Sequence, residues 1–156
     1  MVKDKFMRSA IREAYKNLKR VDGGPFGACI VKGNKILAVS RNTVLKSDAT
    51  AHAEINAIRA ASKRIGKFDL SGCTIYSTTE PCPMCFSAIH WARIDKLVYG
   101  TTISDVSKRG FNELKISVLK LKSLGKSKLR IHPDFLRDEC RLLLGDWDKL
   151  KTKKLY

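Results

Sequence analysis

Three side chains in two short motifs have the chemistry needed to bind a zinc ion. His52 stands in His52-Ala53-Glu54, and Cys82 and Cys85 stand in Pro81-Cys82-Pro83-Met84-Cys85. Zinc binds imidazole nitrogen and thiolate sulfur, and a catalytic zinc site uses three protein ligands and leaves a fourth position for water. The two thiolates also cancel the charge of the ion, which leaves a bound nucleophile free to react. The sequence therefore predicts a catalytic zinc site.

Glu54 has a different predicted role from the three ligands. It follows His52 by two positions, and residues spaced in this way do not share a helix face. We therefore do not expect Glu54 to bind the same ion. A carboxylate beside an activated water is well placed to carry protons, so Glu54 is the predicted catalytic residue.

Helix starts are expected to position the ligands. Thr50 precedes an apolar run and is the predicted N-cap of a helix whose first turn contains His52. A second helix is predicted to begin near Pro81, so that Cys82 and Cys85 share a face of its first turn. The free N–H groups of that turn favour the thiolate form.

A structural zinc site and a redox site are the alternatives for the two cysteines. A structural site needs a fourth ligand, and the remaining cysteines and histidines show no ligand-like spacing: Cys29, Cys73, Cys140, His90 and His132. A thioredoxin-like Cys-x-x-Cys motif would leave His52 and Glu54 unexplained. The combination therefore favours catalysis.

The chain of 156 residues fits a single domain, residues 1–156, with a substantial core. No apolar run approaches the length of a membrane span, and no leader pattern precedes the first helical segment, so we expect no membrane association. Cysteines needed as thiolates indicate a reducing compartment, and the predicted location is the cytoplasm.

The formal net charge of +16 has two interpretations. Clustered basic residues are typical of nucleic-acid binding proteins. Here the basic residues are spread along the chain, with the highest density in the last third, and exposed-looking aromatic residues do not alternate with them. A solvated lysine-rich surface is therefore the other interpretation.

The hydrophobic periodicity predicts alternating helices and strands. The expected helices cover residues 3–20, 51–63, 82–92 and 135–150, and the expected strands cover residues 28–32, 35–40, 74–78 and 97–100. Residues 111–121 carry mixed signals, and residues 122–128 are predicted as a loop. This order predicts an α/β sheet covered on both faces, with the site at strand ends.

Beyond the zinc motif, several segments make the chain similar to the cytidine-deaminase-like superfamily, whose nucleobase deaminases carry the H-x-E and P-C-x-x-C pattern. Within that superfamily it most resembles the bacterial-type guanine deaminases. The segments that carry the resemblance are 23–28, 50–54, 80–85, 88–93, Gly110-Phe111 and 153–156.

This resemblance implies a three-layer α/β/α sandwich with a five-stranded mixed sheet. It also implies a homodimer in which a C-terminal segment, roughly residues 130–156, is exchanged between subunits. The zinc ligands and the proton-carrying Glu54 match the family pattern. The implied substrate contacts come from Phe26, Asn42, Ala53, Trp91, Glu113 and Tyr156. Asn112-Glu113 stands where the family usually has two aspartates.

The activity implied is hydrolytic deamination of a purine base, guanine to xanthine and ammonia. A tRNA-specific adenosine deaminase is the main alternative, because Asp138-Glu139-Cys140 and the leucines after it resemble the last helix of those enzymes, and a basic tail suits RNA phosphates. Cytidine or dCMP deamination is a weaker option. A non-enzymatic module with a structural zinc is disfavoured by Glu54.

Overall fold

The computed structural model describes residues 2–156 and contains a central five-stranded sheet. The strands are β1 (Gly27–Lys32), β2 (Lys35–Arg41), β3 (Cys73–Thr79), β4 (Lys96–Thr101) and β5 (Arg130–His132). Their order across the sheet is β2-β1-β3-β4-β5. β1 runs antiparallel to β2 and β3, whereas β3, β4 and β5 are parallel. The mixed five-stranded sheet was predicted and is confirmed.

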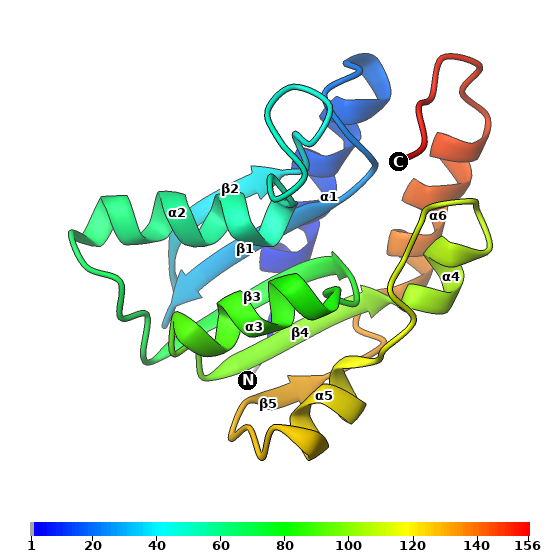
Figure 1. Cartoon of the computed structure of the whole chain (residues 1–156). Helices are drawn as coiled ribbons and strands as arrows, with labels where there is room; N and C mark the ends of the chain where they lie inside the picture. The colour runs from blue at the N-terminus through cyan, green and yellow to red at the C-terminus, as the bar shows by residue number, and fades with distance from the viewer. Residues whose placement is uncertain (1) are drawn as a thin grey trace.

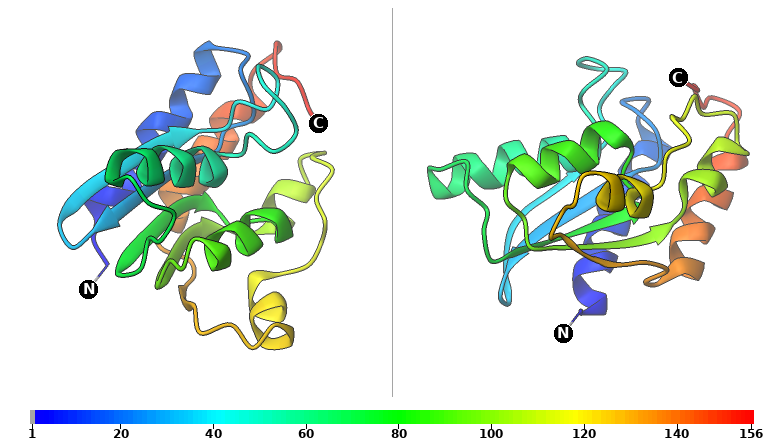
Figure 2. Two further views of the ribbon diagram at one scale, coloured as in Figure 1. Left: turned by 60° about the vertical axis from the view of Figure 1, so that its left-hand side comes forward. Right: turned by 60° about the horizontal axis from the view of Figure 1, so that its bottom comes forward.

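Helices cover both faces of the sheet (Figures 1 and 2). The helices are α1 (Asp4–Lys19), α2 (Ala53–Ile65), α3 (Pro83–Trp91), α4 (Ile103–Ser107), α5 (Val118–Leu124) and α6 (Arg137–Asp148). The right-hand view of Figure 2 shows α2 and α3 on one side of the sheet and α1 and α6 on the other. The fold is therefore a three-layer α/β/α sandwich.

The alternation of side chains along the strands explains the two cores. On β3, Ile75 packs in the cluster beneath α2 and α3, while the next residue, Tyr76, packs in the cluster beneath α1. The same alternation places Ser77 and Thr79 on the face of Ile75, toward the metal-bearing helices. Both faces of β3 are thus buried, as the position of the strand in the middle of the sheet requires.

The structure corrects several predicted boundaries. α2 and α3 begin later than expected, so Thr50 is not a helix cap and its hydroxyl instead donates to Asp48. Residues 118–124, partly predicted as a loop, form α5. The short elements α4 and β5 were not predicted, because five and three residues carry too little periodicity to detect. None of the helices in residues 2–156 combines the length and apolar character needed to cross a bilayer.

The last helix packs very closely on the sheet. A Cβ atom placed on Gly100 of β4 would lie 2.3 Å from the Sγ of Cys140 on α6, so only glycine allows this approach. From α6 the chain turns back, and Tyr156 lines a cavity together with Phe26, Asn42 and their neighbours. The docking of α6 on β4 therefore sets where the tail lies.

Candidate active site

The three predicted zinc ligands meet in one cluster. His52 Nδ1 lies 3.7 Å from Cys82 Sγ and 3.6 Å from Cys85 Sγ, and the ligand atoms of all three residues lie within 4.8 Å of one another. Zinc bonds of about 2.1 Å to nitrogen and 2.3 Å to sulfur at a tetrahedral angle place such atoms about 3.6 Å apart. The donor set and its spacing fit one zinc ion.

Two helix N-termini bring these ligands together. His52 is the N-cap of α2, and Cys82 is the N-cap of α3, whose first residue is Pro83. Both residues have extended backbone angles and neither uses its side chain for capping, so the imidazole and the thiol remain available to a metal. The ligands were predicted inside the first turns. His52 and Cys82 instead lie at the N-terminal boundaries of α2 and α3, respectively.

The cluster already favours a thiolate before a metal binds. The thiol of Cys85 donates to Cys82, and His52 adds a further hydrogen bond; together they lower the pKa of Cys82 to about 4. The same hydrogen bond and burial raise the pKa of Cys85. A zinc ion bound by His52, Cys82 and Cys85 would require both sulfurs as thiolates, so its binding would release the proton that the two cysteines share.

Glu54 lies next to the cluster in the second position of α2 and is only 6 % exposed. Ser77 on β3 donates to its Oε1 at 2.7 Å, and Cys85 Sγ lies 3.4 Å from its Oε2. Burial raises the pKa of Glu54 above its ordinary value, although the charge of His52 opposes this effect. A carboxylate with one oxygen held and the other facing the metal cluster can accept and return a proton.

A small cavity opens beside Glu54 and the zinc ligands. Phe26, Asn42, Glu113 and Tyr156 line it together with His52, Glu54, Thr79, Glu80 and Cys82. Its volume is about 30 Å³, roughly the share of one water molecule in the liquid. A neighbouring hollow of about 240 Å³ shares His52, Cys82, Glu113 and Tyr156 with it. The two spaces therefore adjoin each other beside the zinc ligands.

Polar and aromatic contacts fix the walls of the cavity. Asn42 is 1 % exposed, and its Oδ1 accepts a hydrogen bond from the backbone N–H of Val44. The ring of Phe26 packs edge-on against Phe111. The hydroxyl of Tyr156 accepts a hydrogen bond from the N–H of Gly24 at 3.0 Å. These side chains, predicted from separate parts of the sequence, meet in one place.

Glu113 is the second carboxylate of the cavity. It belongs to the irregular segment 108–117, which links α4 to α5. Burial raises its pKa to about 6, and the negative charge of Cys82 adds to this effect. Glu113 thus brings to the cavity wall an acidic group that comes from a loop, whereas Glu54 comes from a helix.

Two predicted contact residues are not part of this arrangement. Ala53 is the first residue of α2 and is fully buried, but it does not line the cavity. Trp91 is the last residue of α3, is 77 % exposed, and lines a surface groove with Leu121 and Leu124. The structure places Trp91 at the end of α3 remote from Cys82.

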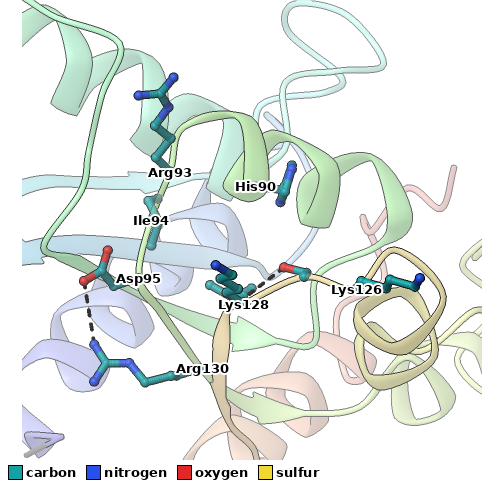
Figure 3. Close-up of a pocket in the computed structure, with 9 residues that line it drawn as sticks. His90, Arg93, Ile94, Asp95, Lys126, Lys128 and Arg130 are labelled. Carbon is teal, nitrogen blue, oxygen red and sulfur yellow. Dashed lines mark hydrogen bonds and ion pairs between the residues drawn. The ribbon is translucent and has the colours of Figure 1, made fainter.

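A hollow of about 600 Å³ lies at this remote end of α3 and is lined by His90, Arg93, Lys126, Lys128, Arg130 and neighbouring residues (Figure 3). Figure 3 shows Arg93 and Arg130 extending away from Lys128, and Arg130 pairs with Asp95. Arg93 pairs with Asp69. Both guanidinium groups are thus paired with carboxylates, and Asp95 lines the hollow itself, so the hollow is not a purely basic anion site.

The sequence motifs did not indicate the role of Ser77. A signal was nevertheless present, because Ser77 is a polar residue at an inward-facing position of a buried strand, two residues after Ile75. Glu80 lies in segment 80–85, but the local pattern assigns it no role, and its contacts depend on residues distant in sequence.

Comparison with known proteins places this site in a family. Residues 1–101 match the cytidine and deoxycytidylate deaminase zinc-binding region. The chain is 43% identical to a guanine deaminase of Bacillus subtilis (strain 168) over 109 residues, which are 69% of this chain and 70% of the relative. It is 37% identical to a tRNA-specific adenosine deaminase of Buchnera aphidicola subsp. Schizaphis graminum over 147 residues, which are 94% and 93%.

Comparison with solved structures supports the same family. A solved guanine deaminase from Nitrosomonas europaea has a TM-score of 0.81 at 28% identity, over 94% of this chain and 85% of that chain. With the ligand cluster and Glu54 in place, the chain belongs to the cytidine and deoxycytidylate deaminase zinc-binding family. It is a zinc-dependent aminohydrolase.

Proposed function

We propose that the protein converts guanine to xanthine and ammonia. The observation that carries this proposal is the carboxylate of Glu113 in the wall of the cavity that also contains Glu54 and the zinc ligands. Guanine presents N–H donors at N1 and at its exocyclic amine, which a carboxylate can accept. Adenine presents an acceptor at N1, which an ionised carboxylate would repel. Glu113 therefore favours guanine.

The other walls suit a flat base. Asn42 carries both an amide donor and a carbonyl acceptor, and Phe26 offers an aromatic face or edge. The hydroxyl of Tyr156 accepts from Gly24 and keeps its own proton free to donate. Burial raises the pKa of Tyr156, so this hydroxyl stays protonated.

The reaction adds water to the ring carbon that bears the exocyclic amine and releases that amine as ammonia. Bound zinc, held by His52, Cys82 and Cys85, supplies a Lewis acid that makes water reactive near neutral pH. Glu54 accepts the proton of the attacking water and transfers it to the adjacent ring nitrogen. Glu54 then carries the second proton to the departing amine, and the carbon–nitrogen bond breaks as the carbonyl forms. Ser77 holds the other oxygen of this carboxylate during both transfers.

The decisive experiment measures ammonia release from guanine, guanosine, adenine, cytidine, dCMP and a tRNA anticodon stem-loop containing adenosine. We expect turnover of guanine. We expect the Glu113→Gln variant to keep only about a tenth to a hundredth of the kcat/KM for guanine, while the Asp69→Asn variant, altered far from the cavity, keeps all of it. Turnover of adenosine in tRNA without turnover of guanine would reject the proposal.

Adenosine in tRNA is the second candidate, and two observations favour it. The similarity to a tRNA-specific adenosine deaminase extends over 94% of this chain, and the net charge of +16 suits a polyanion. Tyr156 is the opposing observation, because its side chain forms part of the wall of the small cavity that a base flipped out of RNA would have to enter.

We also propose a homodimer in which residues 130–156 are exchanged. The tail of the described chain makes its contacts within one subunit, through the N–H groups of Gly24 and Asn112. The same contacts are available to a tail from a second subunit. Exposed Trp91 and Leu124 on the adjacent helices α3 and α5 offer an apolar surface for the partner.

Hybrid dimers test the exchange. A variant lacking residues 155–156 is mixed with a Glu54→Gln variant under conditions that allow subunits to exchange. With an exchanged tail, one of the two sites in each hybrid pairs an intact Glu54 with an intact Tyr156 and regains activity. Hybrids confirmed by mass but without regained activity would show that the tail acts on its own subunit.

The cytoplasm is the proposed location. All five cysteines are free in the described chain, and a zinc site that depends on two thiolates requires reducing conditions.

A further inference from the structure

Glu80 is a buried carboxylate with an unusual pair of hydrogen bonds. It is 7 % exposed and immediately precedes Pro81 in the metal motif. Its Oε2 accepts from the N–H of Ile103 at 3.0 Å, and its Oε1 accepts from the N–H of Val118 at 2.9 Å. Each oxygen therefore accepts a hydrogen bond from a backbone N–H group, and Glu80 is not one of the zinc ligands.

The two donors are the first residues of two helices. Ile103 begins α4 and Val118 begins α5, and N–H groups in a first helical turn have no partner inside the helix. The single carboxylate of Glu80 therefore satisfies both and holds residues 103 and 118 together. Figure 1 shows the chain between them leaving α4, running without regular structure and returning to α5. We call residues 103–118, which comprise α4, the irregular segment 108–117 and the first residue of α5, the cavity loop.

The cavity loop carries the residues that close the site. Glu113 lines the cavity, and Phe111 packs against the rings of Phe26 and Tyr156. The N–H of Asn112 donates to the backbone oxygen of Tyr156 at 3.1 Å. The position of the loop therefore determines where both the carboxylate and the tail stand.

We propose that Glu80 is a positioning residue that anchors the cavity loop at both ends and thereby orients Glu113 toward the substrate. The contact between Glu113 and guanine rests on the proposed function, whereas the anchoring itself does not. Residues 108–117 contain no helix or strand, so the ends of the loop supply much of its restraint. Freeing the ends increases the conformations that the loop must lose on binding.

Two variants remove the anchor in different ways. Glu80→Gln keeps one acceptor oxygen but turns an amide donor toward a backbone donor. Val118→Pro leaves Glu80 intact and deletes one N–H; proline is tolerated at the first helical position, and Ser117 has the extended backbone that proline requires before it (φ −68°, ψ 151°). Asp69→Asn, at a paired surface carboxylate, is the matched control.

The first readout is steady-state kinetics with guanine. We expect both anchor variants to raise KM about tenfold or more with a smaller change in kcat and unchanged zinc content, because Glu54 and the ligands are untouched. The effect of Glu80→Gln on kcat/KM must also depend on Glu113. Combining Glu80→Gln with Glu113→Ala should therefore lower kcat/KM little more than Glu113→Ala alone. Additive losses, or a fall confined to kcat, would overturn the proposal.

The second readout needs no substrate. Lys108, Arg109 and Lys115 lie in the cavity loop, and trypsin cleaves such sites faster when the surrounding backbone opens. We expect cleavage at these sites to accelerate about tenfold in both anchor variants, at temperatures where the fold stays intact by circular dichroism, and to stay unchanged in Asp69→Asn. Unchanged cleavage in both variants would overturn the anchoring role even if guanine proves not to be the substrate.

Discussion

The replacement of Glu54 by glutamine tests the catalytic assignment most directly, because the structure predicts which interactions survive. Ser77 donates to Oε1 of Glu54 at 2.7 Å, and the carbonyl oxygen of the substituted side chain would still accept this bond. The new amide group would face Cys85, whose sulfur lies 3.4 Å from Oε2 and accepts a hydrogen bond as a thiolate. The change therefore preserves the shape and the packing of the site.

What the variant loses is the ability to exchange protons. General acid–base catalysis contributes about 10²–10⁴-fold to rate, which is about 2.7–5.4 kcal/mol at 1.36 kcal/mol per tenfold. Because the bond from Ser77 survives and the new amide can donate to the Cys85 thiolate, the loss should fall on kcat, while KM and zinc content stay close to those of the unchanged protein.

The assay is steady-state ammonia release from guanine, with zinc measured in the same samples. A Ser77→Ala variant provides the matched comparison, since it keeps the carboxylate and removes only its hydrogen bond. Near-native turnover by zinc-replete Glu54→Gln protein would refute the proton-carrying role. A loss of zinc from that variant would instead show that Glu54 supports the metal.

Three further predictions concern the metal, the pH profile and the tail. Cys85→Ala should lose most of its zinc and unfold at a lower temperature, since the ion joins α2 to α3; metal analysis showing full occupancy would reject the ligand set. The kcat/KM for guanine should fall as the pH falls through about 6, where Glu113, with a pKa of about 6, becomes protonated and stops accepting guanine N–H groups. This acidic limb should be absent from the profile of Glu113→Gln, and an unchanged profile would contradict the contact. Deleting residues 155–156 should impair guanine turnover without changing the zinc content, and unimpaired turnover would show that Tyr156 is dispensable.

The zinc chemistry could be predicted from the sequence because the ligand types and Glu54 lie in two short motifs whose spacing is local. The alternating helices and strands were similarly visible, because sustained hydrophobic periodicity reports burial. Two of the ligands were nevertheless expected slightly too deep in their helices. His52 and Cys82 are N-caps, and neither has the serine, threonine, asparagine or aspartate side chain that normally identifies such a position.

The remainder of the site depends on distant contacts that no local pattern encodes. Ser77 reaches Glu54 across the interface between a strand and a helix, and Glu113 reaches the cavity through a loop held by Glu80. The resemblance to a family suggested Glu113 and Tyr156 as candidates. It equally suggested Trp91, which the structure places on the surface at the other end of α3.

The contact between Gly100 and Cys140 gives evolution a way to tune this enzyme from outside its active site. Any side chain at position 100 would push α6 outward from β4, because the space that a Cβ needs is occupied by the sulfur and Cβ of Cys140. The displacement would travel along α6 to Tyr156, which ends the same segment. Substrate access and tail closure could thus drift through substitutions in the core, while the metal ligands and the proton-carrying carboxylate remain unchanged.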